Sequence, residues 1–250
     1  MCTASWTRFE GGYELFFTRD ERTTRGTALP PSVRVEAGVS FVAPTDRDAG
    51  GTWIAANEHG LTLSLLNGYI ESGASTPGAR SRGALVTELS AARSTAGVAE
   101  RLAGTDLSDF LSFRLLAFEP EAQVRAFVWD GRALVVEDDT QAPIVSSSVD
   151  PLGAGAARRA LYAELVGDTL PGVAELEAFH ASHRPERGPL SVCMHREDAS
   201  SVSLTRVRVE RSAEVDAVRM TYSGGPPCEG RPAVVTVLPL AASAGSTSRT

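Results

Sequence analysis

The chain begins with the stretch Met1-Cys2-Thr3-Ala4-Ser5-Trp6-Thr7-Arg8-Phe9-Glu10-Gly11-Gly12-Tyr13-Glu14-Leu15-Phe16-Phe17-Thr18-Arg19-Asp20-Glu21. Two runs of strand-forming residues, 5–9 and 13–17, flank the turn at Gly11-Gly12. Such runs around a glycine-containing turn are typical of a β-hairpin. We therefore expect the start of the chain to fold back beside the segment that ends at Glu21.

Cys2 gives this hairpin a potential chemical role. An initiator methionine is normally removed when the next residue is as small as cysteine, and Cys2 would then carry a thiol and a free α-amine on adjacent carbons. The amine could act as the base for the thiol, which is the chemistry of an N-terminal nucleophile. The alternative interpretation is that Cys2 is an ordinary small apolar residue at the start of a strand.

The composition indicates a globular protein that has no nucleic-acid partner. The chain has 250 residues, of which 42% are hydrophobic and 22% charged, and its net charge is −7. That acidic balance argues against binding to nucleic acid or to an anionic membrane. No run approaches the roughly 20 apolar residues that a membrane span requires, and the N-terminus has no pattern of a signal peptide. We expect a cytoplasmic location.

The cysteines and histidines predict no metal site and no cofactor. Cys193 and Cys228 form neither a disulfide framework nor a metal-ligand spacing with Cys2, so all three thiols should be reduced. Cys193 is expected to be buried and Cys228 exposed in a loop. His180 and His183 could ligate a metal from one helix face, but without further ligands a solvated pair is the expectation. His195 is expected at a strand end that runs into a polar turn.

The rest of the sequence alternates between strands and helices. Residues 50–54 are expected to enter a strand, and further strands are expected at 61–66, 113–118, 124–129, 133–136, 190–195, 202–209, 217–222 and 233–238. Expected helices lie within 82–103, from 150 onward and at 173–180. Leu29-Pro30-Pro31 is predicted to be an extended loop. This order indicates an α+β protein, and two stacked antiparallel sheets between helical layers would suit it, although periodicity by itself does not establish that arrangement. Residues 1–239 are expected to form a single domain, and residues 240–250 a disordered tail.

Several blocks in register resemble the NRDE family, also named for transport and Golgi organization protein two, whose members begin Met-Cys. After Cys2 come the blocks Phe16–Glu21, Gly50–Trp53, Asn57–Asn67 and Arg82–Val86, and Val192–Arg196 looks like the bacterial branch. The asparagine of the family's Asn-Arg-Asp-Glu motif is Thr18 in this chain.

The same blocks resemble, more distantly, the cysteine branch of the N-terminal-nucleophile (Ntn) hydrolases, which includes penicillin V acylase, bile salt hydrolase and the acid ceramidase group. This resemblance implies an αββα fold. It also implies that Cys2 is the nucleophile, that Arg19 favours its thiolate, that Asp20 holds the α-amine, and that Asn67 donates to the oxyanion. Relatives carry a second asparagine where this chain has the serines at 146–148.

Other interpretations of these residues remain open at this point. Arg19 and Asp20 could be a solvated charge pair at a turn, and Asn67-Gly68 could be no more than a hairpin turn. The predicted function is hydrolysis of a non-peptide carbon–nitrogen (amide) bond by Cys2. The alternative is a carrier without turnover, because the family has been associated with haem handling and with lipid or membrane trafficking. Either role predicts a small-molecule partner, and the oligomeric state is left open.

Overall fold

The computed structural model describes residues 2–68, 80–167 and 169–242, and these form two antiparallel β-sheets with two pairs of helices. One sheet is built from β1 Cys2–Phe9, β2 Gly12–Arg22, β10 Ile144–Ser146, β11 Ala199–Arg211, β12 Asp216–Gly224 and β13 Ala233–Pro239. The other is built from β3 Leu29–Glu36, β4 Val39–Thr45, β5 Ile54–Asn57, β6 Thr62–Asn67, β7 Phe113–Phe118, β8 Arg125–Trp129 and β9 Leu134–Glu137.

The strand order brings both ends of the described chain into one sheet. The first sheet has the order β10-β1-β2-β11-β12-β13, and the second runs in chain order from β3 to β9. The predicted first hairpin is confirmed, with Cys2 paired to Arg19. Its turn needs glycine at Gly11, where φ is +76° and a Cβ would lie 2.5 Å from the carbonyl oxygen of Arg211.

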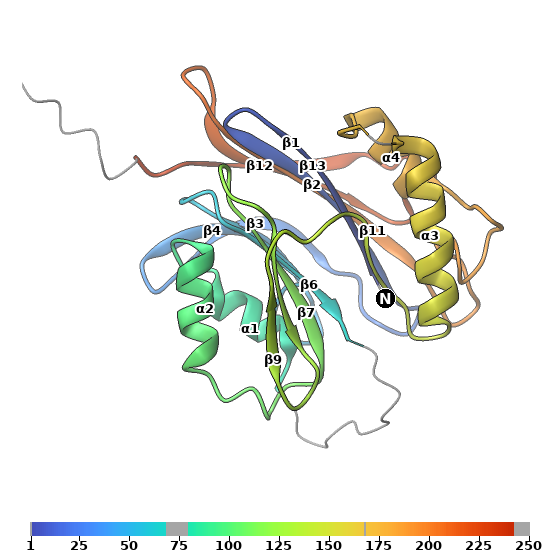
Figure 1. Ribbon diagram of the computed structural model, residues 1–250, viewed down its shortest axis with the longest axis horizontal. Coiled ribbons are helices and arrows are strands. Elements are labelled where there is room, and N and C mark those ends of the chain that lie inside the picture. Colours follow the sequence, from blue (N-terminus) through green and yellow to red (C-terminus); the bar gives the residue numbers. More distant parts are fainter. Residues whose placement is uncertain (1, 69–79, 168, 243–250) are drawn as a thin grey trace, which may run out of the picture.

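The helices lie on the outer faces of the two sheets, which confirms the predicted αββα layers (Figure 1). Helices α1 Arg82–Leu89 and α2 Thr95–Ala103 cover the seven-stranded sheet, and α3 Pro151–Val166 and α4 Val173–Ala181 cover the six-stranded sheet. Ser81, Ser94 and Asp150 cap α1, α2 and α3 by accepting a hydrogen bond from a backbone N–H in the first turn.

Alternation along the strands separates an inner core from an outer one. In β7, Leu116 and Phe118 pack between the sheets, whereas Phe113, Leu115 and Ala117 face α1 and α2. The outer face of the six-stranded sheet is more polar, because buried serine and threonine side chains occupy it beneath α3 and α4. That polar layer fixes several of the residues discussed below.

Two segments differ from their sequence-based assignments. Leu29-Pro30-Pro31 begins β3 instead of forming a loop; β3 is an edge strand whose register shifts between Leu29 and Ser32, where prolines without an N–H are tolerated. Residues 190–195 are not a strand. Ser191, Val192, Cys193 and Met194 are all buried, without the alternation of a strand, and both edges of neighbouring β11 are already paired with β2 and β12. Strands β4 and β10 were not predicted.

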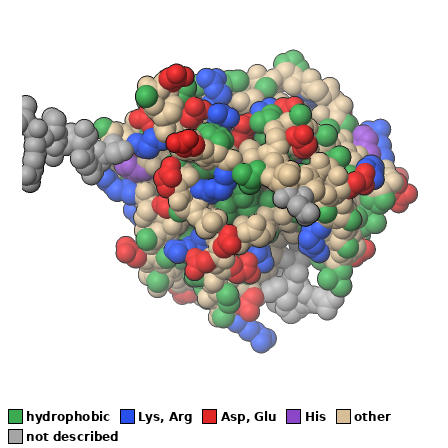
Figure 2. All heavy atoms as spheres, turned by 45° about the horizontal axis from the view of Figure 1, so that its top comes forward, with side chains coloured by type: hydrophobic (Ala, Val, Ile, Leu, Met, Phe, Trp, Pro, Cys, Tyr) green, Lys and Arg blue, Asp and Glu red, His purple; other side chains and the backbone are tan. Residues whose placement is uncertain are grey.

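The surface mixes charges of both signs. Figure 2 shows acidic and basic side chains interspersed on one face, and many arginines pair with carboxylates, as Arg114 does with Glu137. Exposed pairs of this kind contribute about 1 kcal/mol or less each, so the buried layers carry the stability. No helix within the described ranges is both long and apolar enough to cross a bilayer. Of the predicted tail, residues 243–250 lie outside the described residues.

Candidate active site

A cavity of about 370 Å³ opens at the start of β1, between the two sheets and the beginning of α1. All four residues proposed from the sequence line it, namely Cys2, Arg19, Asp20 and Asn67. The remaining wall combines charged and apolar side chains, among them Arg25, Asp46, Trp53, Leu65, Arg80, Arg82 and Leu111. The fold therefore brings together residues that are up to 65 positions apart in the sequence, from Cys2 to Asn67.

Cys2 lies at the first position of β1, in the centre of the pairing between β10 and β2. It pairs with Ser146 on one side and Arg19 on the other, and only 7% of its surface is exposed. Burial raises the pKa of the Cys2 thiol above its ordinary value, and the negative charge of Asp20 acts in the same direction. The positive charges of the chain's amino terminus and of Arg19 lower this pKa, but burial is the larger effect. The thiol is therefore protonated at neutral pH.

Arg19 is a buried cation held by acidic partners and an aromatic ring. Its guanidinium donates to Asp46 Oδ2 at 2.7 Å and to Glu21 Oε2 at 3.0 Å, and lies 4.3 Å from the centre of the Trp53 ring. Although burial opposes it, hydrogen bonds from Arg25 and from a backbone N–H, together with the charge of Arg19, lower the pKa of Asp46. The interpretation of Arg19 as a solvated residue is wrong.

Asp20 is buried on the opposite face of β2 from Arg19, because successive strand residues point to opposite sides. Ser201 of β11 donates to Asp20 Oδ1 at 2.6 Å, and Arg158 of α3 lies 3.6 Å from Asp20 Oδ2. The Asp20 and Arg158 side chains are both fully buried. Arg19 and Asp20 are therefore held by different partners and do not form the solvated pair that sequence alone left open.

Asn67 is the last residue of β6 and pairs with Phe113 of β7. The two strands are joined through residues 68–112, which include α1 and α2, so the interpretation of Asn67-Gly68 as a tight hairpin turn is wrong. Ser146, on the other side of Cys2, donates its hydroxyl to the Asn67 carbonyl oxygen at 2.7 Å. This hydrogen bond ties β10 to the end of β6 at the edge of the cavity.

Thr18, which replaces the family asparagine, points away from the cavity toward α4. Its hydroxyl lies 2.7 Å from His180 Nδ1, and the hydroxyl of Ser5 lies 2.8 Å from His180 Nε2. Burial, with a smaller effect from Arg158, lowers the pKa of His180 to about 3. His180 is fully buried, so the expectation of a solvated His180–His183 pair is wrong. Thr18 thus contacts α4 and does not line the cavity.

Sequence reasoning missed part of the cavity. Asp46 and Arg25 had no recognisable motif. Gly51 and Trp53 belong to the family-like block Gly50–Trp53, to which sequence reasoning assigned no role, and the structure supplies one. A Cβ on Gly51 would collide with the backbone of Gly83 at the start of α1, so glycine lets this helix close over the cavity.

The layer order and the strand that begins at Cys2 are those of the Ntn-hydrolase fold, and solved structures share it. An N-acylethanolamine-hydrolyzing acid amidase ortholog from Caenorhabditis elegans matches with a TM-score of 0.55 at 12% identity, over 82% of this chain and 92% of that one. A mutant of conjugated bile acid hydrolase from Clostridium perfringens matches with a TM-score of 0.50 at 9% identity, over 94% of this chain and 96% of that one.

The chain belongs to the Transport and Golgi organisation 2 family, whose model matches residues 1–149. That range contains Cys2, Arg19, Asp20 and Asn67. A search of curated protein sequences gave no match.

Proposed function

We propose that this protein hydrolyses a non-peptide amide bond with Cys2 as an N-terminal nucleophile. The observation that carries the proposal is that Cys2, Arg19, Asp20 and Asn67 line one cavity at the start of the first strand. Its volume of about 370 Å³ lies within the range of small-molecule sites. The proposal requires removal of Met1, which places the α-amine on Cys2 itself.

The protonated resting state of the thiol determines how the reaction would start. Burial raises the pKa of Cys2, so a base must take its proton as sulfur attacks the carbonyl carbon. The α-amine of Cys2 is that base in our proposal, with the Asp20 carboxylate positioning it. Asp20 is suited to this task because Ser201 and Arg158 hold its side chain from two other elements.

Bond making and breaking then follow an acyl-transfer sequence. The amine of Cys2 passes the proton to the leaving nitrogen, the carbon–nitrogen bond breaks, and the acyl group remains on Cys2 as a thioester. Water attacks the thioester and releases a carboxylic acid and the free thiol. Asn67 would donate to the oxyanion in both steps, a contact whose removal costs about 10²–10³ in kcat in well-studied hydrolases.

The cavity wall suggests a substrate that has both an apolar and an anionic part. Trp53, Leu65 and Leu111 provide apolar surface, and Arg80 and Arg82 place two further cations beside it. N-acyl amino acids carry an amide between an apolar acyl chain and a carboxylate. They are therefore the first compounds to test, beside lactams and simple amides.

The test begins with the intact mass of the purified protein, which should lack Met1. A panel of N-acyl amino acids, lactams and amides is then assayed with wild type and Cys2→Ala. Removal of the nucleophile should reduce hydrolysis at least about a thousandfold, and Asn67→Ala should reduce kcat about 10²–10³-fold. Retention of Met1 in an active protein would contradict the α-amine mechanism.

A carrier function is the second candidate, and one observation favours it. The raised pKa of Cys2 leaves the thiol unreactive unless a base is supplied, so the cavity could bind a ligand without cleaving it. Panel compounds that raise the melting temperature of wild type without being hydrolysed would support the carrier. Haem binding is tested by titrating the protein with haemin and measuring whether the absorption band of haemin shifts.

A further inference from the structure

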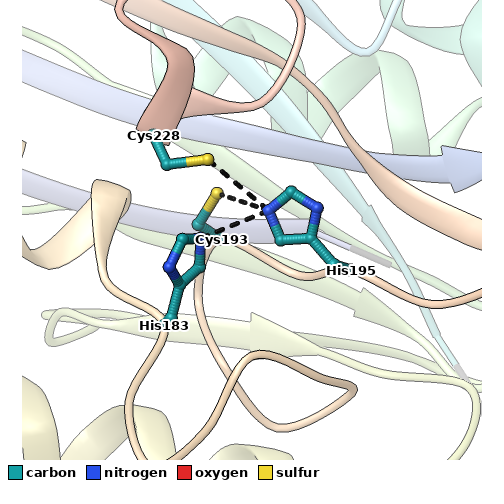
Figure 3. A group of neighbouring side chains, drawn as sticks. All are labelled: His183, Cys193, His195 and Cys228. Atoms are coloured by element: carbon teal, nitrogen blue, oxygen red, sulfur yellow. Dashed lines mark hydrogen bonds between the residues drawn. The ribbon is translucent and has the colours of Figure 1, made fainter.

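Four side chains with metal-ligating atoms meet on the side of the six-stranded sheet that carries α4. They are His183, Cys193, His195 and Cys228, and their ligand atoms all lie within 4.8 Å of one another (Figure 3). Cys193 is buried, the two histidines are half-buried, and Cys228 is exposed. None of the four lines the cavity at Cys2. This cluster could not be recognised from residue spacing, because up to 45 residues separate its members.

Three of the six separations between the ligand atoms, those that involve His195 Nε2, are close to the edges of a tetrahedral site, and all four atoms lie within 4.8 Å of one another. His183 Nε2 lies 3.2 Å from His195 Nε2, and the sulfurs of Cys193 and Cys228 each lie 3.5 Å from the same nitrogen. With metal–nitrogen bonds of about 2.05 Å and metal–sulfur bonds of about 2.3 Å, a tetrahedral zinc site separates two nitrogens by about 3.3 Å and a nitrogen and a sulfur by about 3.5 Å. The four ligand atoms are thus close enough together for small side-chain movements to bring all of them onto one zinc ion.

The backbone holds these ligands in place from three directions. The Cys193 N–H donates to the Ser182 carbonyl oxygen at 3.0 Å, which joins the segments that carry Cys193 and His183. His195 forms a β-bridge with Ser200 next to the start of β11. Cys228 belongs to a short 3₁₀ helix, residues 227–229, between β12 and β13. Ligands fixed in this way require little rearrangement to bind an ion.

We propose that His183, Cys193, His195 and Cys228 bind one structural zinc ion in a tetrahedral Cys₂His₂ site. Four protein ligands leave no open position, which is the arrangement of structural rather than catalytic zinc. Two thiolates balance the charge of the ion, and the mixture of sulfur and imidazole ligands favours zinc over calcium, magnesium or manganese. Binding releases the thiol protons of both cysteines to solvent.

One contact must change when the ion binds. Arg187 lies 3.3 Å from His195 Nδ1, and a ligating Nε2 leaves a proton on Nδ1. Arg187 is exposed and can turn toward solvent, whereas the Nδ1 proton is then free to bind water. The arginine therefore poses no structural obstacle to the site.

The ion would stabilise the segment that connects α4 to β11. Residues 182–198 contain no helix and no strand, yet Val192, Cys193 and Met194 are completely buried. The Met194 N–H donates to Ser201 Oγ at 2.9 Å, and Ser201 donates to Asp20 at 2.6 Å. Zinc binding at Cys193 and His195 would hold this hydrogen-bond chain, and with it Asp20, in place.

The test measures metal binding by reduced wild-type protein and by two matched variants, Cys228→Ser and Cys2→Ser. Cys228 is exposed, so its replacement should not prevent folding. Wild type and Cys2→Ser should contain one zinc per chain by elemental analysis, and Cys228→Ser should bind at least about tenfold more weakly. Cobalt added to metal-free wild type should give the visible bands of tetrahedral coordination and a thiolate-to-cobalt charge-transfer band.

Zinc should also raise the melting temperature of wild type and of Cys2→Ser, but not that of Cys228→Ser. Equal zinc binding by wild type and Cys228→Ser would overturn the proposal, as would a cobalt complex without the thiolate band. It would also be overturned if Cys193 and Cys228 form a disulfide and the reduced protein still binds no zinc. Because Cys2→Ser removes the proposed thiol nucleophile but retains all four metal ligands, the two proposals succeed or fail separately.

Discussion

Replacement of His180 by glutamine should change how the stability of this protein responds to acid. His180 is enclosed between Ser5 and Thr18, which bond both ring nitrogens, and it stacks on Phe16 at 5.7 Å between ring centres. Glutamine can still hydrogen-bond to both hydroxyls but has no proton to gain near neutral pH. The variant therefore isolates the titration of the buried imidazole.

The direction of the pH effect follows from the pH at which the folded and the unfolded protein each bind a proton at His180. Burial lowers the pKa of His180 from 6.5 to about 3 in the folded protein. Between pH 6.5 and pH 3, the unfolded chain therefore binds a proton at His180, whereas the folded chain does not. The stability of wild type is complete above pH 6.5 and falls by about 1.4 kcal/mol for each pH unit below it. At pH 4.5 the loss amounts to about 2.5–3 kcal/mol, all of it absent from the glutamine variant.

The assay is urea unfolding of wild type and His180→Gln at several pH values between 7.5 and 4.5. At pH 7.5 the variant should be about 1–3 kcal/mol less stable, because the packing and hydrogen bonds of the imidazole are imperfectly replaced. This difference in the free energy of unfolding between wild type and variant should change by about 2.5 kcal/mol in favour of the variant at pH 4.5. Protons that other groups take up in both proteins cancel in the difference. Thr18→Val keeps the imidazole and should keep the acid slope of wild type. A gap that stays constant across this range would refute the reasoning.

Three further changes examine other buried contacts, each by urea unfolding at neutral pH. Arg158→Met should lower the free energy of unfolding by about 3–5 kcal/mol, since it removes the buried cation 3.6 Å from the buried Asp20 carboxylate; a loss below 1 kcal/mol would show that the pair contributes little. Asn57→Ala should cost about 2–4 kcal/mol, because the side chain makes four hydrogen bonds in the turn after β5 and to the segment after α1; a neutral outcome would contradict this. Gly51→Ala should cost about 1–3 kcal/mol and also weaken ligand binding in the cavity, because the added methyl group displaces Gly83; unchanged stability would show that α1 can shift freely.

The local sequence predicted most of the elements. The first hairpin, the strand Phe113–Phe118 and the helix that starts after Asp150 were all marked by turn glycines, alternation or a cap residue. The failures had tertiary causes. β3 tolerates its prolines only because it lies at an edge of the sheet. Residues 190–195 do not form a strand, because both edges of the neighbouring strand β11 are already paired, with β2 and β12.

The residues of the candidate active site that lie on the first hairpin could be predicted from the sequence, whereas the residues that surround Arg19 could not. Cys2, Arg19 and Asp20 lie on the two strands of a single hairpin, so local reasoning could place them side by side. Asp46 and Arg25, which complete the charge network around Arg19, come from loops whose direction depends on the second sheet. No local pattern reports such a position.

The sequence by itself determined the hairpin that carries Cys2 and the alternation of strands and helices. Those features arise from backbone preferences and from periodicity, which act between near neighbours. Only the tertiary structure decided that Arg19 and Asp20 face opposite sides with separate partners, that His180 is buried and uncharged, and that His183, Cys193, His195 and Cys228 meet. These outcomes depend on contacts between distant segments, because burial and charge are set by whatever the completed fold brings against a side chain.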